Sequence, residues 1–483
     1  MKKLIIFAVA LLALGFAAKS FAIQAEIPAD TTAVIAKGGT QVTIGGDLRV
    51  RGVSAQNIRD FNRHVTDGDA VVGPNGKPEK MLYDYRYRLN IEAKVTPNTK
   101  AFIQLDGSGE TGTDDNGEFG SPDNPSNVAK RNGGSFRFGD QKLGPVRMSQ
   151  AWIQHSGSGL FGVPAYIKVG HQPITVGAGI FYSHTYNNDD ALVAGISPIK
   201  GLDITGIIVK LQENGDLASD DEDLYSLVIS YAINKDVTIG ADVSFLQSQR
   251  GSYQPYAWFG ADVKSNLWNI GFNAKANVAG FKLYGTLDFQ TGDVKCADCW
   301  NYSTFHYNGY AITFGGSYKF APVTVALDFG YGSGDNKNYD NKFSTFQTAQ
   351  SNTVHYTFVY DYHTINAAGA RTGGLQNTMF AKLSANGDVM KGLNVGGSVA
   401  LLNAARKVVG SGDNNWFDRP VSSRYIGTEI DATLTYQIDK GLKYFVEAGY
   451  LFAGKFWKWP ATGSFDGKIS DPWVVRHGLQ LNF

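Results

Sequence analysis

Over positions 84–95 the sequence alternates strictly between apolar and polar residues, and this alternation leaves few folds open to the chain. The apolar members, one at every second position, are Tyr85, Tyr87, Leu89, Ile91, Ala93 and Val95. A period of two residues is typical of a β-strand with one apolar and one polar face. Residues 96–99 (TPNT) then predict a tight turn, and a second amphipathic strand returns over 101–106.

The same amphipathic hairpin recurs five more times, and the connections along the chain alternate between short and long. Each predicted hairpin closes through a turn of two to four residues. Long stretches rich in Asp, Asn, Gly and Ser separate the hairpins, at 107–145, 212–222, 248–256, 292–308, 333–375, 403–424 and 454–472. This alternation is typical of outer-membrane barrels, which have short periplasmic turns and long extracellular loops. A soluble sandwich would have no reason to collect its long loops at one end.

The remaining strands decide the size of the barrel. We expect them at 41–54, within 146–211 and at 473–483, which brings the count to eighteen. Sixteen is the alternative, because the segment 164–197 is irregular. An even number, with both termini on the periplasmic side, suits a single-chain bacterial barrel. We therefore predict an all-β chain in which residues 41–483 form one transmembrane antiparallel up-and-down β-barrel.

The N-terminus predicts export from the cytoplasm. A basic start at residues 1–3, an apolar run over 4–18 and small residues up to Ala22 are typical of a secretory signal peptide, here residues 1–22. A single membrane anchor is the alternative, but the run is shorter than the ~20 residues that a spanning helix needs. Residues 23–40 would form a periplasmic lead-in. The rest of the chain is close to electrically balanced, so nucleic acid is not an expected partner.

A secreted chain of amphipathic hairpins that ends in Phe483 resembles the Gram-negative outer-membrane porins. The resemblance implies a channel in the outer membrane, surrounded by lipid, that passes small hydrophilic solutes or ions and needs no cofactor. In porins the terminal aromatic residue of the last strand is the recognition element for insertion into the membrane. The resemblance therefore implies that Phe483 is the insertion signal read by the barrel-assembly machinery.

Short motifs carry a closer resemblance. Residues 166–173 (YIKVGHQP) with 176–179 (VGAG) are similar to alginate-export-type barrels, although those usually carry Arg at the position of His171. Residues 29–34 (ADTTAV) with 42–52 (VTIGGDLRVRG) are similar to the OmpJ-like channel proteins of metal-reducing delta-proteobacteria. Both resemblances imply a channel in the outer membrane of a Gram-negative bacterium.

Charged side chains on the strands are expected to face the lumen, since charge on the lipid face costs about 2–4 kcal/mol at the bilayer midplane. The inward arginines of the first, second and last strands are Arg49, Arg51, Arg86, Arg88 and Arg476. The acids expected across the lumen are Glu429, Asp431 and Glu447. Opposed walls of this kind set pore selectivity. The alternative is a set of scattered lumen charges that are paired with their neighbours, such as Asp47 and Glu92.

Three further features of the sequence are candidate functional sites. The Gly-rich segment 171–189 is a candidate constriction loop that folds into the pore, with an ordinary external loop as the alternative; its residues of interest are Phe181, Tyr182, His184, Tyr186 and Asp189. Cys296 and Cys299 are candidates for a local disulfide, because a zinc site would need more ligands. His477 interrupts the outward apolar pattern, either as a neutral side chain or at the subunit contact of a homotrimer.

The sequence thus favours a passive diffusion channel that catalyses no reaction. An outer-membrane lipase or protease is one alternative, but no nucleophile, His and acid stand out together. The other alternative is a barrel that encloses a partner, either an electron-conduit cytochrome or an exported polysaccharide. The chain itself lacks a haem-binding C-x-x-C-H, because Trp300 follows Cys299.

Overall fold

The computed structural model describes the strands, their short turns and parts of the long loops. The described residues are 35–37, 39–58, 80–107, 117–118, 146–159, 162–213, 221–248, 263–296, 304–335, 340–351, 355–361, 374–407, 423–457 and 470–483. The predicted signal peptide, 1–22, and most of the predicted lead-in, 23–40, lie outside them. Among the described residues, no helix is long and apolar enough to cross a membrane.

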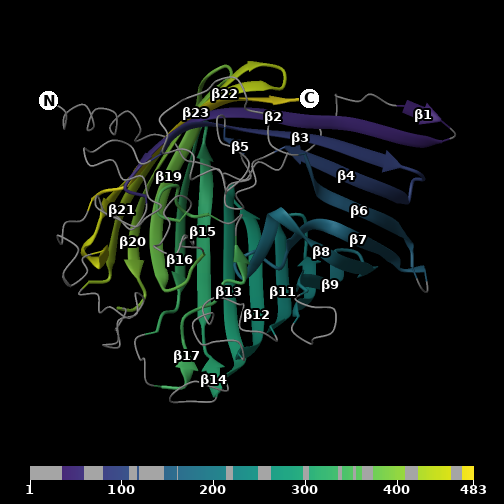
Figure 1. The fold of residues 1–483 in the computed structure, drawn as a ribbon, viewed down its shortest axis with the longest axis horizontal. Helices are drawn as coiled ribbons and strands as arrows, with labels where there is room; N and C mark the ends of the chain where they lie inside the picture. Colours follow the sequence, from purple (N-terminus) through teal and green to yellow (C-terminus); the bar gives the residue numbers. More distant parts are fainter. Residues whose placement is uncertain are drawn as a thin grey trace, which may run out of the picture.

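Eighteen long antiparallel strands close into one barrel (Figure 1). They are β2 (Thr40–Gln56), β3 (Lys80–Lys94), β4 (Thr99–Gly107), β6 (Arg147–Ser158), β7 (Pro164–Thr175), β8 (Tyr182–Ile199), β9 (Leu202–Gln212), β10 (Glu222–Ala232), β11 (Val237–Ser248), β12 (Val263–Val278), β13 (Phe281–Cys296), β15 (Tyr310–Phe320), β16 (Val323–Gly332), β19 (Thr378–Met390), β20 (Leu393–Ala404), β21 (Tyr425–Asp439), β22 (Leu442–Ala453) and β23 (Trp473–Asn482). The predicted count of eighteen is confirmed, and the alternative of sixteen is wrong.

Short elements accompany the barrel. They are β1 (Ile35–Lys37), β5 (Gly117–Glu118), β14 (Thr304–Tyr307), β17 (Lys342–Phe343), β18 (Gln350–Ser351) and the 3-10 turn η3 (Lys455–Trp457). The irregular region that made the strand count uncertain is a long hairpin of β7 and β8, with a register shift between Gln172 and Ile174. The hairpin is longer than the sequence pattern indicated, because β7 continues to Thr175 and β8 begins already at Tyr182.

The barrel closes where the first strand meets the last. β2 pairs with β23 from Asp47 opposite Asn482 to Gln56 opposite Trp473. Beyond this register the backbone N–H of Phe483 donates to the Gly46 carbonyl at 3.0 Å, and the Gly46 N–H donates back to the Phe483 carbonyl at 2.7 Å. The terminal residue is therefore part of the seam between the two ends of the sheet.

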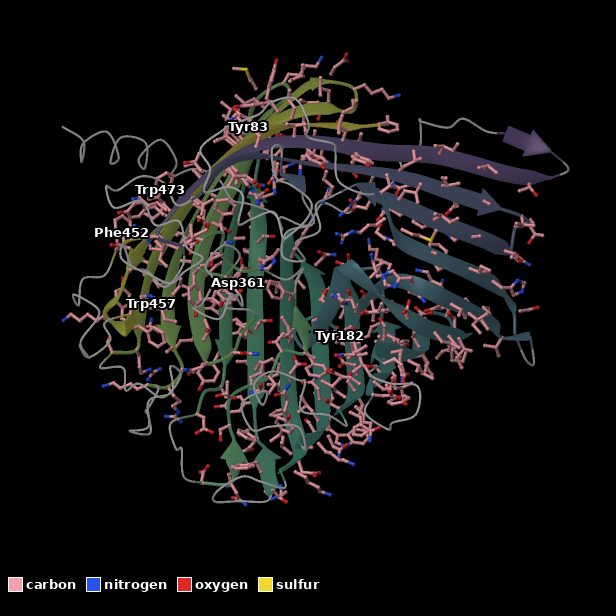
Figure 2. The ribbon with its side chains drawn as sticks, in the orientation of Figure 1. Tyr83, Tyr182, Asp361, Phe452, Trp457 and Trp473 are labelled. Carbon is pink, nitrogen blue, oxygen red and sulfur yellow. The ribbon has the colours of Figure 1, made fainter. Side chains whose placement is uncertain are left out.

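The two faces of the last strand follow the predicted pattern. Val475, Leu479 and Leu481 are 38–46% exposed on the outer surface, whereas Arg476 and Gln480 are buried on the inner surface. Aromatic residues such as Tyr83 and Phe452 also lie on the outer surface of the barrel (Figure 2).

One aromatic residue of the opening hairpin departs from the expected lipid exposure. Tyr83 is 57% exposed, but Tyr85, two residues further along the same face, is only 4% exposed. The short strand β5 pairs with β3 at this point, with Gly117 opposite Tyr85. Alternation along a single strand cannot reveal such a neighbouring segment.

The seam yields a prediction for Gly46. A Cβ atom added there would lie 2.2 Å from the Arg88 carbonyl oxygen and 3.0 Å from the Phe483 ring. Because the nearer atom belongs to the backbone, Gly46→Ala is expected to lower the free energy of unfolding by about 1–3 kcal/mol. Gly206→Ala is the matched control, since the nearest atom to its new Cβ lies 3.9 Å away. The unfolding midpoint of each variant is measured from its heat-dependent gel mobility. Equal midpoints for the two variants would contradict the prediction.

Candidate functional site: the barrel lumen

The inner wall of the barrel is lined by polar side chains that bond across neighbouring strands. The Asn269 amide on β12 donates to Asp288 on β13 at 2.8 Å. The hydroxyls of Thr286 and Thr313 lie 2.6 Å apart on β13 and β15. In a barrel strand the alternate residues face the lumen, so these contacts form polar rows that run around the inside of the barrel.

The predicted arginines of β2 and β3 face inward, and Arg51 and Arg86 each contact an acid. Arg51 makes a two-point contact with Asp84, with Nε–Oδ1 at 2.8 Å and Nη2–Oδ2 at 2.6 Å. Arg86 Nη2 lies 3.2 Å from Asp47 Oδ1, and both side chains are almost completely buried. Arg49 is half-buried directly opposite Arg86 in the strand register.

The two remaining arginines are paired in the same way. Arg88 Nε lies 3.0 Å from Asp106 Oδ2 on β4, and Arg476 Nε donates to Glu447 on β22. The five arginines are therefore close together, as expected, but four of them form a ladder of ion pairs with carboxylates on neighbouring strands. This placement matches the alternative of paired lumen charges more closely than an open cationic wall.

The predicted acids Glu429 and Asp431 do not face open water. Glu429 is 0% exposed and Asp431 is 3% exposed. Glu429 Oε1 accepts the Val359 N–H at 2.5 Å, and its Oε2 accepts the Tyr360 N–H at 2.8 Å. Asp431 accepts the Ser398 hydroxyl at 3.0 Å. A loop from another part of the chain therefore covers both acids, and their role as pore-lining charges remains a proposal.

This loop, which we call the inner loop, comprises the described residues 340–351 and 355–361 between β16 and β19. At its other end the Gln347 N–H donates to Gln290 Oε1 at 2.8 Å, and Gln290 Nε2 donates to the Gln347 carbonyl at 2.7 Å. Further along, β18 pairs in parallel with the start of β8, and the Ala349 N–H donates to the Phe181 carbonyl at 3.0 Å. The inner loop thus extends from the β8 and β13 wall to the β21 wall.

The segment 355–361 is a compact turn with its own hydrogen bonds. His355 Nδ1 lies 3.0 Å from Asp361 Oδ2, and the Asp361 N–H donates to the Thr357 hydroxyl at 3.0 Å. Burial, with the nearby Asp361 charge as a second cause, raises the pKa of Tyr356 well above its usual value. The phenol therefore keeps its proton, and it donates to the Gly374 carbonyl at 3.1 Å.

Wall residues hold this turn on two further sides. Lys382 Nζ donates to the Tyr356 carbonyl at 2.9 Å, and the Tyr356 ring stacks on Phe380 with 4.6 Å between centroids and 2° between planes. The Arg476 guanidinium lies over the Phe358 ring at 4.8 Å. Thus one of the predicted pore arginines contacts the inner loop as well as Glu447.

The predicted constriction segment 171–189 is mostly strand, and only the turn 176–181 joins β7 to β8. A Cβ atom at Gly177 would lie 2.0 Å from Asp242 Oδ1, on the inner face of β11. The turn therefore folds toward the lumen wall three strands away from β8. Gly177 has φ of +55°, a conformation that favours glycine. A role in narrowing the pore remains a proposal.

Three residues chosen in this segment form one network. The Tyr182 hydroxyl donates to Asp189 Oδ2 at 2.9 Å, and His184 Nδ1 lies 2.5 Å from Asp189 Oδ1. Tyr182 and Phe181 are 0% and 2% exposed. The network links residues of β8 close to the turn 176–181. The side chain of Tyr186 lies outside the described residues.

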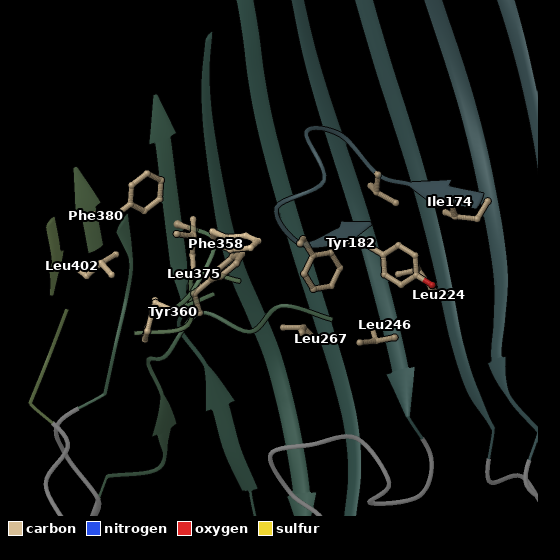
Figure 3. Packing of buried hydrophobic residues seen from close by; sticks show 14 of the residues in the cluster. Ile174, Tyr182, Leu224, Leu246, Leu267, Phe358, Tyr360, Leu375, Phe380 and Leu402 are labelled. Carbon is tan, nitrogen blue, oxygen red and sulfur yellow. The ribbon is translucent and has the colours of Figure 1, made fainter. Parts of the chain in front are cut away.

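An apolar row on the inner wall explains why the two segments fold inward. Val209, Leu224, Leu246 and Leu267 are directly opposite one another on four successive strands. All four face the lumen and are at most 2% exposed. Figure 3 shows this side of the buried cluster with Tyr182, and the other side with Phe358, Tyr360, Leu375, Phe380 and Leu402.

The inner loop was not predicted from the sequence, although the strands carry a signal of a covered inner wall. In a water-filled barrel the inward positions are polar, so a row of inward leucines indicates that another segment covers them. Leu224, Leu246 and Leu267 are the inward neighbours, on their own strands, of Ser226, Ser244 and Asn269, respectively. The pattern could have indicated a covered wall, but it could not have named the covering segment.

The remaining candidate residues have local roles or fall outside the description. His477 lies on the outer face, with its Nδ1 3.3 Å from the Tyr444 hydroxyl and its ring 6.3 Å from that of Tyr83. Its contacts are therefore intramolecular, and a homotrimer remains a prediction. Cys299 and the side chain of Cys296 lie outside the described residues. Among the described residues, no group of three or more His, Cys, Asp or Glu is placed to bind a metal.

Between the turn 176–181, the inner loop and the wall there remains a cavity of about 430 Å³. A solute has room in this cavity beside the inner loop. The lumen therefore combines a polar wall, two inward-folded segments and a residual space of small-molecule size.

Comparisons with known proteins found one matching family model and several similar solved structures. The family model described as Alginate export matches residues 208–464. The solved outer-membrane protein OpdK from Pseudomonas aeruginosa is 11% identical, with 91% of this chain and 98% of that chain covered and a TM-score of 0.50. The outer-membrane channel DcaP of Acinetobacter baumannii is 13% identical, with coverages of 94% and 100% and a TM-score of 0.43. No curated protein matches the sequence significantly.

Proposed function

The chain belongs to the alginate export family, and on that premise we propose that it is a water-filled channel through which small hydrophilic solutes or ions diffuse across the outer membrane. The observation that carries the proposal is the closed eighteen-strand barrel with a polar inner wall and a residual cavity of about 430 Å³. A closed barrel satisfies all its backbone hydrogen bonds within lipid. Such an architecture conducts without a chemical step, so we propose no catalytic role.

A second candidate function is export of a polysaccharide, which the description of the matching family favours. A polymer chain or an enclosed cytochrome needs an unobstructed path through the barrel. The inner loop is bonded to Gln290 on one wall and to Glu429 on another, and so it occupies part of that path. We therefore favour small solutes over an extended polymer.

The test is the current carried by the purified protein alone in planar lipid bilayers. We expect stepwise conductance in KCl, and we expect that small polyethylene glycols reduce it while larger ones are excluded from the pore. Absence of conductance steps would overturn the channel. Entry of large polyethylene glycols would instead favour the polymer path.

A further inference from the structure

The cavity between the inner loop and the wall has a mostly apolar lining with few charges. Its walls come from β12, β13, β15, β16 and β19, and its roof comes from the turn 176–181 and the inner loop. The apolar part of the lining includes Ile180, Leu375, Phe380 and the ring of Tyr356. Small-molecule sites are typically concave, largely apolar and supplied with a few placed polar groups.

The charged residues of the cavity lie in one row of the sheet. Lys275 is directly opposite Tyr284, and Tyr284 is opposite Gly315. Gly315 is in turn opposite Asp328, which is opposite Lys382. The row therefore carries a cation at one end, an aromatic hydroxyl beside it and an acid next to a second cation at the other end.

The two ends of the row differ in charge balance. Asp328 accepts the Tyr284 hydroxyl at 2.8 Å and is the direct cross-strand neighbour of Lys382. Opposite charges at such positions compensate each other, and Lys382 Nζ is also bonded to the Tyr356 carbonyl. Lys275 is exposed in the lumen and makes no ion pair with any other described residue. Within the part of the chain that the structure describes, the cavity thus has one uncompensated positive charge.

Gly315 lies between the two ends of the row. A Cβ atom there would lie 2.4 Å from Asp328 Oδ1 and 2.8 Å from both the Leu327 carbonyl oxygen and Tyr284 Cε1. The absence of a side chain lets the Tyr284 hydroxyl cross β15 and reach Asp328 on β16. The hydrogen bond between Tyr284 and Asp328 therefore depends on Gly315.

We propose that this cavity is a binding site for a small monocarboxylate with an apolar body, whose carboxylate meets Lys275 and whose body packs under Tyr356 and Phe380. The proposal rests on the proposed channel function and names the class of solute that pauses in the lumen. The uncompensated ammonium selects one negative charge, and a cavity of about 430 Å³ accepts a molecule of one-ring size. The apolar roof disfavours a polyhydroxylated chain.

Benzoate and its neutral analogue benzamide are the probes, and calorimetric titration of the purified full-length protein in detergent is the measurement. We expect saturable binding of benzoate and binding of benzamide that is weaker by about tenfold or more, because the charged hydrogen bond is lost. Lys275→Met is expected to weaken benzoate binding by a similar factor. Gly315→Val is expected to weaken it as well, because the new side chain would displace Tyr284 and Asp328, which line the cavity.

Gly316→Ala is the matched control, since Gly316 is the next residue of β15 and its new Cβ would meet the Leu283 side chain on the outer face. It should bind benzoate like the unchanged protein. Equal binding of benzoate and benzamide, or undiminished binding in both Lys275→Met and Gly315→Val, would overturn the proposal. Conductance in KCl is recorded for the same preparation, so a channel that conducts without binding benzoate refutes the site and leaves the channel intact.

Discussion

Deletion of residues 335–375 is expected to raise the single-channel conductance several-fold. The deletion removes the inner loop, which reaches from Gln290 to Glu429 across the inside of the barrel. The strands on either side can still be joined, because the Asn377 N–H donates to the Ser333 carbonyl at 3.2 Å. The four residues left between β16 and β19 are enough for a tight turn.

The same deletion should also lower the thermal stability of the barrel. It uncovers the inward leucines Leu246 and Leu267, which are at most 2% exposed beneath the loops. Full exposure of a leucine side chain costs about 1.5–3 kcal/mol. Unchanged conductance in a correctly inserted barrel would show that the inner loop does not limit the current.

Glu429→Gln is a milder form of this test. A carboxylate accepts both the Val359 and Tyr360 N–H groups, whereas an amide has a single acceptor oxygen. We expect larger current fluctuations, because one end of the inner loop is held less firmly. Glu92→Gln is the matched control, since Glu92 pairs with Lys100 and the charge change is identical.

The second large effect is expected from the buried ion pair of Arg86 and Asp47. Their side chains are 2% and 0% exposed, and removal of one partner from a buried pair costs about 3–5 kcal/mol because an uncompensated charge remains. Arg86→Gln and Asp47→Asn should each destabilise the barrel by about that amount. The double variant should be clearly less destabilised than the sum of the two, since it leaves no charge behind.

The same variants should change ion selectivity in opposite directions. Arg86→Gln leaves a negative charge and should shift the reversal potential toward cations, whereas Asp47→Asn should shift it toward anions. In the double variant the reversal potential should lie near that of the unchanged protein. The pair Lys100 and Glu92 is the control, because its side chains are 37% and 32% exposed and such pairs contribute only ~0–1 kcal/mol. Additive effects at Arg86 and Asp47 would refute the paired ladder.

The strands were predictable from sequence because their signal is local. Each lipid-facing residue must be apolar, so Leu479 and Leu481 alternate with Gln480 and Asn482 without reference to the rest of the chain. The even number of strands and the aromatic residue at the end of the last strand, Phe483, could also be read from the sequence. The same alternation shows which residues of each strand face inward, which is why the arginines of β2 and β3 could be placed on one inner surface.

The charge partners and the covered wall were only partly accessible. Arg88 meets Asp106 one strand away, and both residues belong to the opening hairpin that alternation had identified. Glu429 instead meets a loop about 70 positions earlier in the chain, and nothing in its own strand distinguishes it from a solvated acid. Periodicity shows which way a side chain points and leaves open what lies in front of it.

The sequence by itself therefore determined the barrel, its two faces and its location, because the bilayer imposes a constraint on every second residue of every strand. It left the strand number open between eighteen and sixteen. The tertiary structure alone decided how the lumen is filled. Loop residues such as Gln347 and Tyr360 carry no period, and their positions depend on hydrogen bonds to distant wall residues such as Gln290 and Glu429. The lumen that a solute meets is shaped by these long-range contacts.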